Sequence, residues 1–168
     1  MTLKIFGAPH LYVQGPGALS ELQSILSQLG NRAFIVIDPG IADMIRPKLE
    51  AGFGRSFVDA MVAHFGGECT AAEISRLTVK CRDFAPDLIV GVGGGKAIDT
   101  AKAVCLEFQR PLVIVPTISS NDAPTSRIAV IYTEDHVLSE VRRLPTNPYA
   151  VIVDTAILIE APKRFFVA

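Results

Sequence analysis

The stretch that decides the fold is Asp87–Val104, "DLIVGVGGGKAIDTAKAV". It begins with an apolar run of strand length, passes through three consecutive glycines and a lysine, and continues in a segment with helical periodicity. A continuous run rich in Ile and Val is typical of a strand that is buried on both faces of a parallel sheet. The stretch therefore predicts a buried strand, a glycine loop and a helix.

The rest of the chain repeats this alternation. Residues 18–30, 41–52, 70–84 and 96–108 have helical patterns, and Thr70 and Glu73 stand at the positions of a capping box. Further strands are expected at 11–14, 32–38, 111–117, 127–133 and 150–155, whereas 56–67 is ambiguous and 127–143 suggests a β-excursion. The pattern predicts an α/β fold with a doubly wound, mostly parallel, Rossmann-like sheet.

Composition narrows the function classes. The chain has 168 residues, 49% of them hydrophobic, which is typical of one globular domain. Its net charge of -1 gives no indication of a surface for nucleic acid or of a polybasic membrane patch. The sequence shows no secretory leader and no apolar run of bilayer length, so we expect a cytoplasmic protein. The three cysteines are widely spaced, and we expect buried or incidental thiols.

The glycine loop suits phosphate binding. Glycines let the backbone turn tightly and approach a ligand, and the N–H groups of the following helix favour an anion. Lys96 adds a positive charge at the first helical turn. Val90, Lys96 and Ile98 stand where a Walker A motif or the common dinucleotide fingerprint requires glycine or alanine. A loop that only permits close packing of strand and helix is the alternative, and we favour phosphate contact.

Two further features follow strands of the same predicted sheet. Asp38 ends the strand 32–38, where a carboxylate either accepts hydrogen bonds from a ribose and disfavours NADP, or caps the next helix. Polar side chains crowd the segment 116–126, which suits a polyhydroxylated or phosphorylated ligand, although a polar surface loop would look similar. The three histidines are dispersed, and we expect surface or packing roles for them.

Three segments, 91–104, 111–133 and 147–155, closely resemble the glycerol dehydrogenase branch of the metal-dependent (iron-type, group III) polyol and alcohol dehydrogenases. The resemblance covers essentially the whole chain. It implies an enzyme that uses NAD and a divalent metal, zinc or iron, to oxidise glycerol to dihydroxyacetone. It also implies a small polyol substrate and a homo-oligomer in the full-length form.

The resemblance also implies site residues. The loop that holds the NAD pyrophosphate falls on Gly93, Gly94, Gly95 and Lys96, and the ribose-binding acid falls on Asp38. The substrate aspartate falls on Asp122. The remaining cofactor contacts fall on Thr117, Ser120, Ser126, Ile128 and Tyr132. The family is usually threonine-rich where this chain has Ile118 to Asn121. No residue of this chain is implied as the catalytic group.

The family has a second, all-helical domain that carries the metal, and its metal ligands are expected beyond Ala168. Residues 1–160 are therefore interpreted as the NAD-binding α/β domain, and 161–168 as the start of the first helix of the helical domain. We expect the 168-residue chain alone to be inactive. The alternatives are a glycerol-1-phosphate dehydrogenase, a dehydroquinate-synthase-like enzyme on the same scaffold, and a stand-alone inactive nucleotide-binding module.

Overall fold

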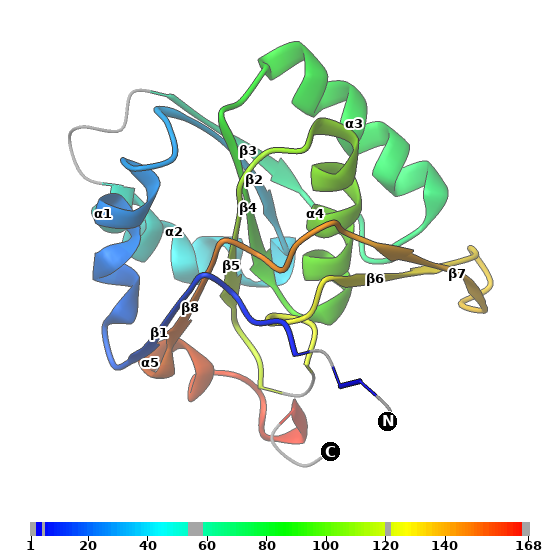
Figure 1. Ribbon diagram of the computed structural model, residues 1–168. Coiled ribbons are helices and arrows are strands. Elements are labelled where there is room, and N and C mark those ends of the chain that lie inside the picture. The colour runs from blue at the N-terminus through cyan, green and yellow to red at the C-terminus, as the bar shows by residue number, and fades with distance from the viewer. Residues whose placement is uncertain (1–2, 5, 54–58, 120–121, 166–168) are drawn as a thin grey trace.

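A six-stranded, fully parallel sheet forms the centre of the computed structural model, which describes residues 3–4, 6–53, 59–119 and 122–165. The strand order is β1-β8-β5-β4-β2-β3 (Figure 1). The strands are β1 (Leu11–Gly15), β2 (Arg32–Ile37), β3 (Asp59–His64), β4 (Leu88–Gly93), β5 (Leu112–Pro116) and β8 (Ala150–Asp154). The predicted Rossmann-like α/β class is confirmed, and the ambiguous segment 56–67 contains a strand.

Helices cover both faces of the sheet, and each face has its own apolar core (Figure 1). The α-helices are α1 (Leu22–Leu26), α2 (Pro39–Phe53), α3 (Ala71–Phe84), α4 (Gly95–Phe108) and α5 (Thr155–Leu158), and the 3-10 helices are η1 (Ala18–Glu21) and η2 (Lys163–Phe165). Leu77 of α3 and Ile98 of α4 belong to one core, and Leu26 of α1 and Ile45 of α2 belong to the other. None of the described helices has the length and apolar character needed to cross a bilayer.

The β-excursion predicted within 127–143 is a separate antiparallel hairpin. Its strands are β6 (Ile128–Tyr132) and β7 (Leu138–Arg143). Cys69 fixes the hairpin to the segment before α3, because its carbonyl accepts a 2.8 Å hydrogen bond from the Tyr132 N–H. The strand β6 packs beside the helix α4, so the hairpin forms a side wall next to this helix (Figure 1).

Two local predictions are corrected. The helix expected at 18–30 is a 3-10 turn followed by only five α-helical residues. Thr70 does cap α3, since its Oγ1 accepts from the Glu73 N–H at 3.2 Å. Glu73, however, accepts from the Gly66 N–H at 2.8 Å and pairs with Arg76, so its carboxylate is directed to the preceding loop and a side chain of α3.

Candidate functional site

A groove of about 510 Å³ opens at the carboxyl end of β4, which is where ligands bind in sheets of this kind. We call it the glycine-loop groove. It brings together six of the residues singled out in the sequence, which are Asp38, Gly94, Gly95, Lys96, Asp122 and Tyr132. Its other lining residues are Phe65, Gly67, Ala97, Asp99, Ile118, Ala123 and Val130. They come from segments that are distant in sequence, including the hairpin strand β6.

Gly93 has no room for a side chain, and a side chain on Gly94 would displace the end of Ile118. Gly93 has a φ of 148°, and a Cβ atom there would lie 2.9 Å from the Cβ of Ala97 and 3.1 Å from that of Asp38. A Cβ on Gly94 would lie 2.8 Å from the Cδ1 of Ile118. The bare backbone therefore lets β4 turn directly into α4. The first turn of that helix, whose N–H groups lack intrahelical partners, lines the groove.

Lys96 gives the groove its positive charge, and its side chain is about half exposed. Its Nζ lies 2.5 Å from the Oε2 of Glu68 and 5.8 Å from the centre of the Tyr132 ring. The same Glu68 oxygen lies 2.6 Å from the Nδ1 of His136. Although burial alone would raise it, the pKa of Glu68 is lowered by its hydrogen bonds with Lys96, His136 and the Cys69 N–H, so this carboxyl is ionised at neutral pH.

Sequence reasoning missed Glu68 altogether. The three groups lie on separate segments, with Lys96 on α4, Glu68 before α3 and His136 in the turn of the β6–β7 hairpin. No spacing in the sequence reveals that they meet. His136 is exposed, as expected for a surface histidine, but it also contacts an acid beside the glycine loop.

Asp38 caps the start of α2 and also lines the groove, whereas its predicted contact with a ribose stays a prediction. Its Oδ1 accepts a 2.9 Å hydrogen bond from the Gly40 N–H in the first turn of α2, so it acts as a helix-capping group. The same residue lines the glycine-loop groove, next to Gly93. Capping and ligand contact are therefore compatible at this position.

A buried ion pair lies beneath the groove. Lys102 is fully buried, and its Nζ donates to the Oδ1 of Asp99 (3.2 Å), to the Oγ of Ser126 (3.2 Å) and to the carbonyl of Ile128 (2.7 Å). The Oδ2 of Asp99 accepts from the Val130 N–H at 3.1 Å. Burial raises the pKa of Asp99 and lowers that of Lys102, and each charge opposes the shift of the other. The pair joins α4 to the hairpin wall.

Three of the remaining predicted residues lie behind or beside the groove. Thr117 is buried, and its N–H donates to the Gly93 carbonyl at 3.1 Å, so it supports the glycine loop from below. Ser126 and Ile128 line an adjacent cavity of about 400 Å³ together with Arg143. Ser120 lies outside the described residues.

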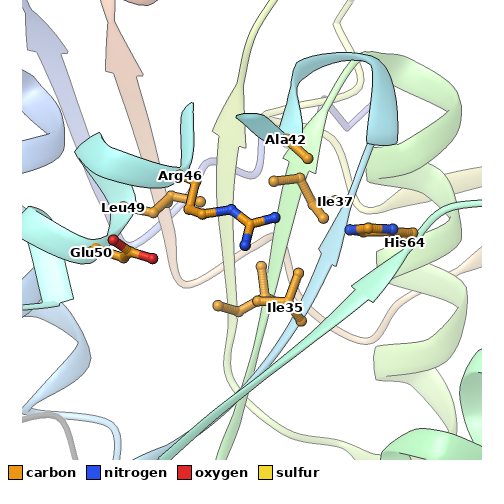
Figure 2. A pocket seen from close by; sticks show the side chains of 8 residues that line it. Ile35, Ile37, Ala42, Arg46, Leu49, Glu50 and His64 are labelled. Carbon is orange, nitrogen blue, oxygen red and sulfur yellow. The ribbon is translucent and has the colours of Figure 1, made fainter. Parts of the chain in front are cut away.

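A second cavity, of about 260 Å³, lies between α2 and the strands β2 and β3 (Figure 2). Its walls are mainly apolar, and they include Ile35 and Ile37 of β2. The charged Arg46 and Glu50 come from α2, and His64 comes from β3 (Figure 2). The cavity contains none of the residues predicted from the sequence.

The described residues form no cluster of metal ligands. Within the described ranges, no group of three or more His, Cys, Asp or Glu side chains is placed to hold an ion. The three cysteines are buried and free, as expected from their spacing.

Comparison with known proteins gives this groove a context. The iron-containing alcohol dehydrogenase family matches residues 9–155. The chain belongs to this family. It is 46% identical to a glycerol dehydrogenase of Thermotoga maritima over 170 residues, which cover all of this chain and 45% of that protein. A probable glycerol dehydrogenase of Sinorhizobium meliloti has a crystal structure that superposes with a TM-score of 0.90, at 42% identity over 99% of this chain and 45% of that one.

Within the iron-containing alcohol dehydrogenase family, the similarity is greater toward glycerol dehydrogenases than toward the phosphate-specific branch. A glycerol-1-phosphate dehydrogenase of Pyrobaculum aerophilum is 29% identical over 99% of this chain. The chain spans about 45% of the length of the relatives that it matches. The resemblance noted in the sequence is thereby confirmed at the level of the family.

Proposed function

We propose that this chain supplies the NAD-binding part of an oxidoreductase that converts glycerol to dihydroxyacetone. The observation that carries the proposal is the composition of the glycine-loop groove. It combines a side-chain-free helix N-terminus, one lysine at its first turn, and two aspartates, Asp38 and Asp122, on flanking loops. The similarity to glycerol dehydrogenases supports the same conclusion.

The residues present fit a dinucleotide. The N–H groups at the start of α4 and the Lys96 ammonium suit the pyrophosphate, because both attract negative charge. The Asp38 carboxylate suits a ribose diol as acceptor and would repel a 2′-phosphate, which favours NAD over NADP. Five further residues remain proposed cofactor contacts, namely Thr117, Ser120, Ser126, Ile128 and Tyr132.

Bound NAD would supply the hydride acceptor of the reaction. The contribution of this chain is to bind the dinucleotide and to orient the polyol beside it. Asp122 is exposed at the rim of the groove, where its carboxylate can accept hydrogen bonds from substrate hydroxyl groups. We assign no general base among the described residues. We also propose that the complete enzyme is a homo-oligomer.

A divalent metal, zinc or iron, remains part of the proposal for the complete enzyme, with ligands expected beyond Ala168. The described part of this chain offers no set of ligands that fits such an ion. The division into an NAD-binding unit at 1–160 and the start of a helical unit at 161–168 is proposed on the same grounds.

The charge of the groove argues against a phosphorylated polyol as substrate. Enzymes that bind a substrate phosphate or carboxylate need cationic groups near it. Among the described residues that line the groove, Lys96 carries the only full positive charge, whereas Asp38, Asp99 and Asp122 are acidic. One lysine suffices for the dinucleotide, and Asp122 instead suits an uncharged polyol.

The test is direct binding of NADH by the 168-residue chain, followed by the fluorescence of the reduced nicotinamide. We expect saturable binding that Lys96→Ala weakens. Lys80→Ala is the matched control, since it removes an exposed lysine on α3 away from the groove and should leave the affinity unchanged. Absence of saturable binding, or equal loss in both variants, would refute the dinucleotide site.

A further inference from the structure

Lys96 is already paired before any ligand is present. Its ammonium contacts the Glu68 carboxylate at 2.5 Å, and Glu68 is nearly buried, with only 11% of its side chain exposed. The Glu68 position is well fixed, because its Oε1 accepts a 3.0 Å hydrogen bond from the Cys69 N–H. In the ligand-free chain, Glu68 therefore lies beside the glycine loop and pairs with the lysine of that loop.

A ligand phosphate and Glu68 need the same ammonium group. A phosphate that contacts the Lys96 Nζ must either displace Glu68 or lie close to it, and like charges at such range repel each other. Part of the attraction between Lys96 and an anion is thus lost in separating the Lys96–Glu68 pair. Because Lys96 is about half exposed, this loss is moderate.

His136 acts on the same carboxylate from the other side. Its Nδ1 lies 2.6 Å from the oxygen that also contacts Lys96. The hairpin turn that carries His136 is fixed near Glu68 by the hydrogen bond from the Tyr132 N–H to the Cys69 carbonyl. When two donors share one oxygen, each of the two interactions is weaker than it would be alone. His136 therefore weakens the ion pair between Glu68 and Lys96.

We propose that Glu68 is a positioning residue that competes with ligand phosphate for Lys96, and that His136 moderates this competition. The proposal rests on the proposed function, since it concerns the phosphates of the dinucleotide. In the free protein, Glu68 holds the lysine and keeps the loop from retaining small anions. The Lys96–Glu68 ion pair forms again when the dinucleotide dissociates, and this favours release of the dinucleotide.

The experiment measures binding of ADP to the 168-residue chain by calorimetry, with adenosine as the phosphate-free probe. We expect Glu68→Gln to tighten ADP binding about three- to five-fold, the effect of an exposed ion pair, and to leave adenosine unchanged. Glu107→Gln removes the same charge from the far end of α4 and is the matched control. His136→Phe should weaken ADP binding. Among the described side chains, only Lys96 then pairs with Glu68, so the ion pair that competes with the phosphate becomes stronger.

A double-mutant cycle identifies the route of the effect. If Glu68 acts through Lys96, Glu68→Gln no longer increases the affinity for ADP when Lys96→Ala is also present. Unchanged or weaker ADP binding by Glu68→Gln, in a chain that binds NADH, overturns this inference and leaves the proposed function intact. A chain that binds neither ADP nor NADH, with or without Glu68, overturns both.

Discussion

At the scale of single residues, substitution can separate the capping role of Asp38 from the cofactor-selecting role proposed for it. Asp38→Asn keeps an oxygen that can accept from the Gly40 N–H but removes the negative charge that disfavours a 2′-phosphate. We expect this variant to narrow the preference for NADH over NADPH while its melting temperature stays close to that of the unchanged chain. Fluorescence titrations with both nucleotides, together with a thermal melt, measure the two effects.

Asp38→Gly is the companion variant, since it removes both the charge and the capping oxygen. It should narrow the cofactor preference as Asp38→Asn does and also lower the stability of α2 by a few tenths of a kcal/mol. Tighter binding of NADPH than of NADH by the unchanged chain would contradict the role given to Asp38.

At the scale of elements, the Lys102–Asp99 pair joins α4 to β6. Lys102→Met should lower the free energy of unfolding by about 3–5 kcal/mol, because it leaves the Asp99 carboxylate buried without its cation. The double variant Lys102→Met/Asp99→Leu should recover most of this loss, since well-packed apolar residues can replace a buried pair. Urea unfolding followed by circular dichroism measures both.

The double variant also tests whether the attachment of the hairpin to α4 affects NADH binding. Ser126 and the Ile128 carbonyl lose their shared donor in it, so the hairpin wall is less firmly held even where stability is regained. We expect weaker NADH binding by the double variant than by the unchanged chain. A double variant as unstable as Lys102→Met would show that packing, and not the unpaired charge, explains the loss.

Most of the elements were predictable from the sequence, whereas most of the side-chain contacts between them were not. The apolar run 88–93 and the glycines after it identify β4 and the start of α4 because burial on both faces requires such residues. Lys102 carries no comparable signal, since a lysine in a helix is usually on the solvent side. Its burial depends on oxygen atoms of Ser126 and Ile128, which the fold alone brings near.

At the scale of the whole molecule, the three thiols report on global unfolding. Burial raises the pKa of Cys69 and Cys105 to about 11 and that of Cys81 to about 12. At pH 8 these groups are therefore almost entirely protonated, and the thiolate is the reactive form. We expect a disulfide reagent to label the native chain very slowly and all three thiols to react quickly in urea. Native labelling of one thiol at the rate of free cysteine would contradict this.

The whole chain should also be catalytically silent by itself. Lewis-acid activation of a glycerol hydroxyl requires a bound metal, and the described residues provide no cluster of ligands for one. We expect no NADH formation from NAD and glycerol with added zinc or ferrous ion, measured against a glycerol dehydrogenase as positive control. Sustained turnover would show that the catalytic groups lie within these 168 residues.

The parallel pairing of β1 with β8 has a consequence for synthesis. The Gly17 N–H donates to the Oδ1 of Asp154, 137 residues further along the chain, and Leu11 pairs with Ala150 in the sheet. In the described sheet β1 therefore has no partner strand until β8 has been synthesised. Pairings of such long range form slowly, and an unpaired strand is open to contacts with other chains in the meantime. A nascent chain that stalls before Ala150 would expose β1 in this way, and chaperone demand should be greatest there.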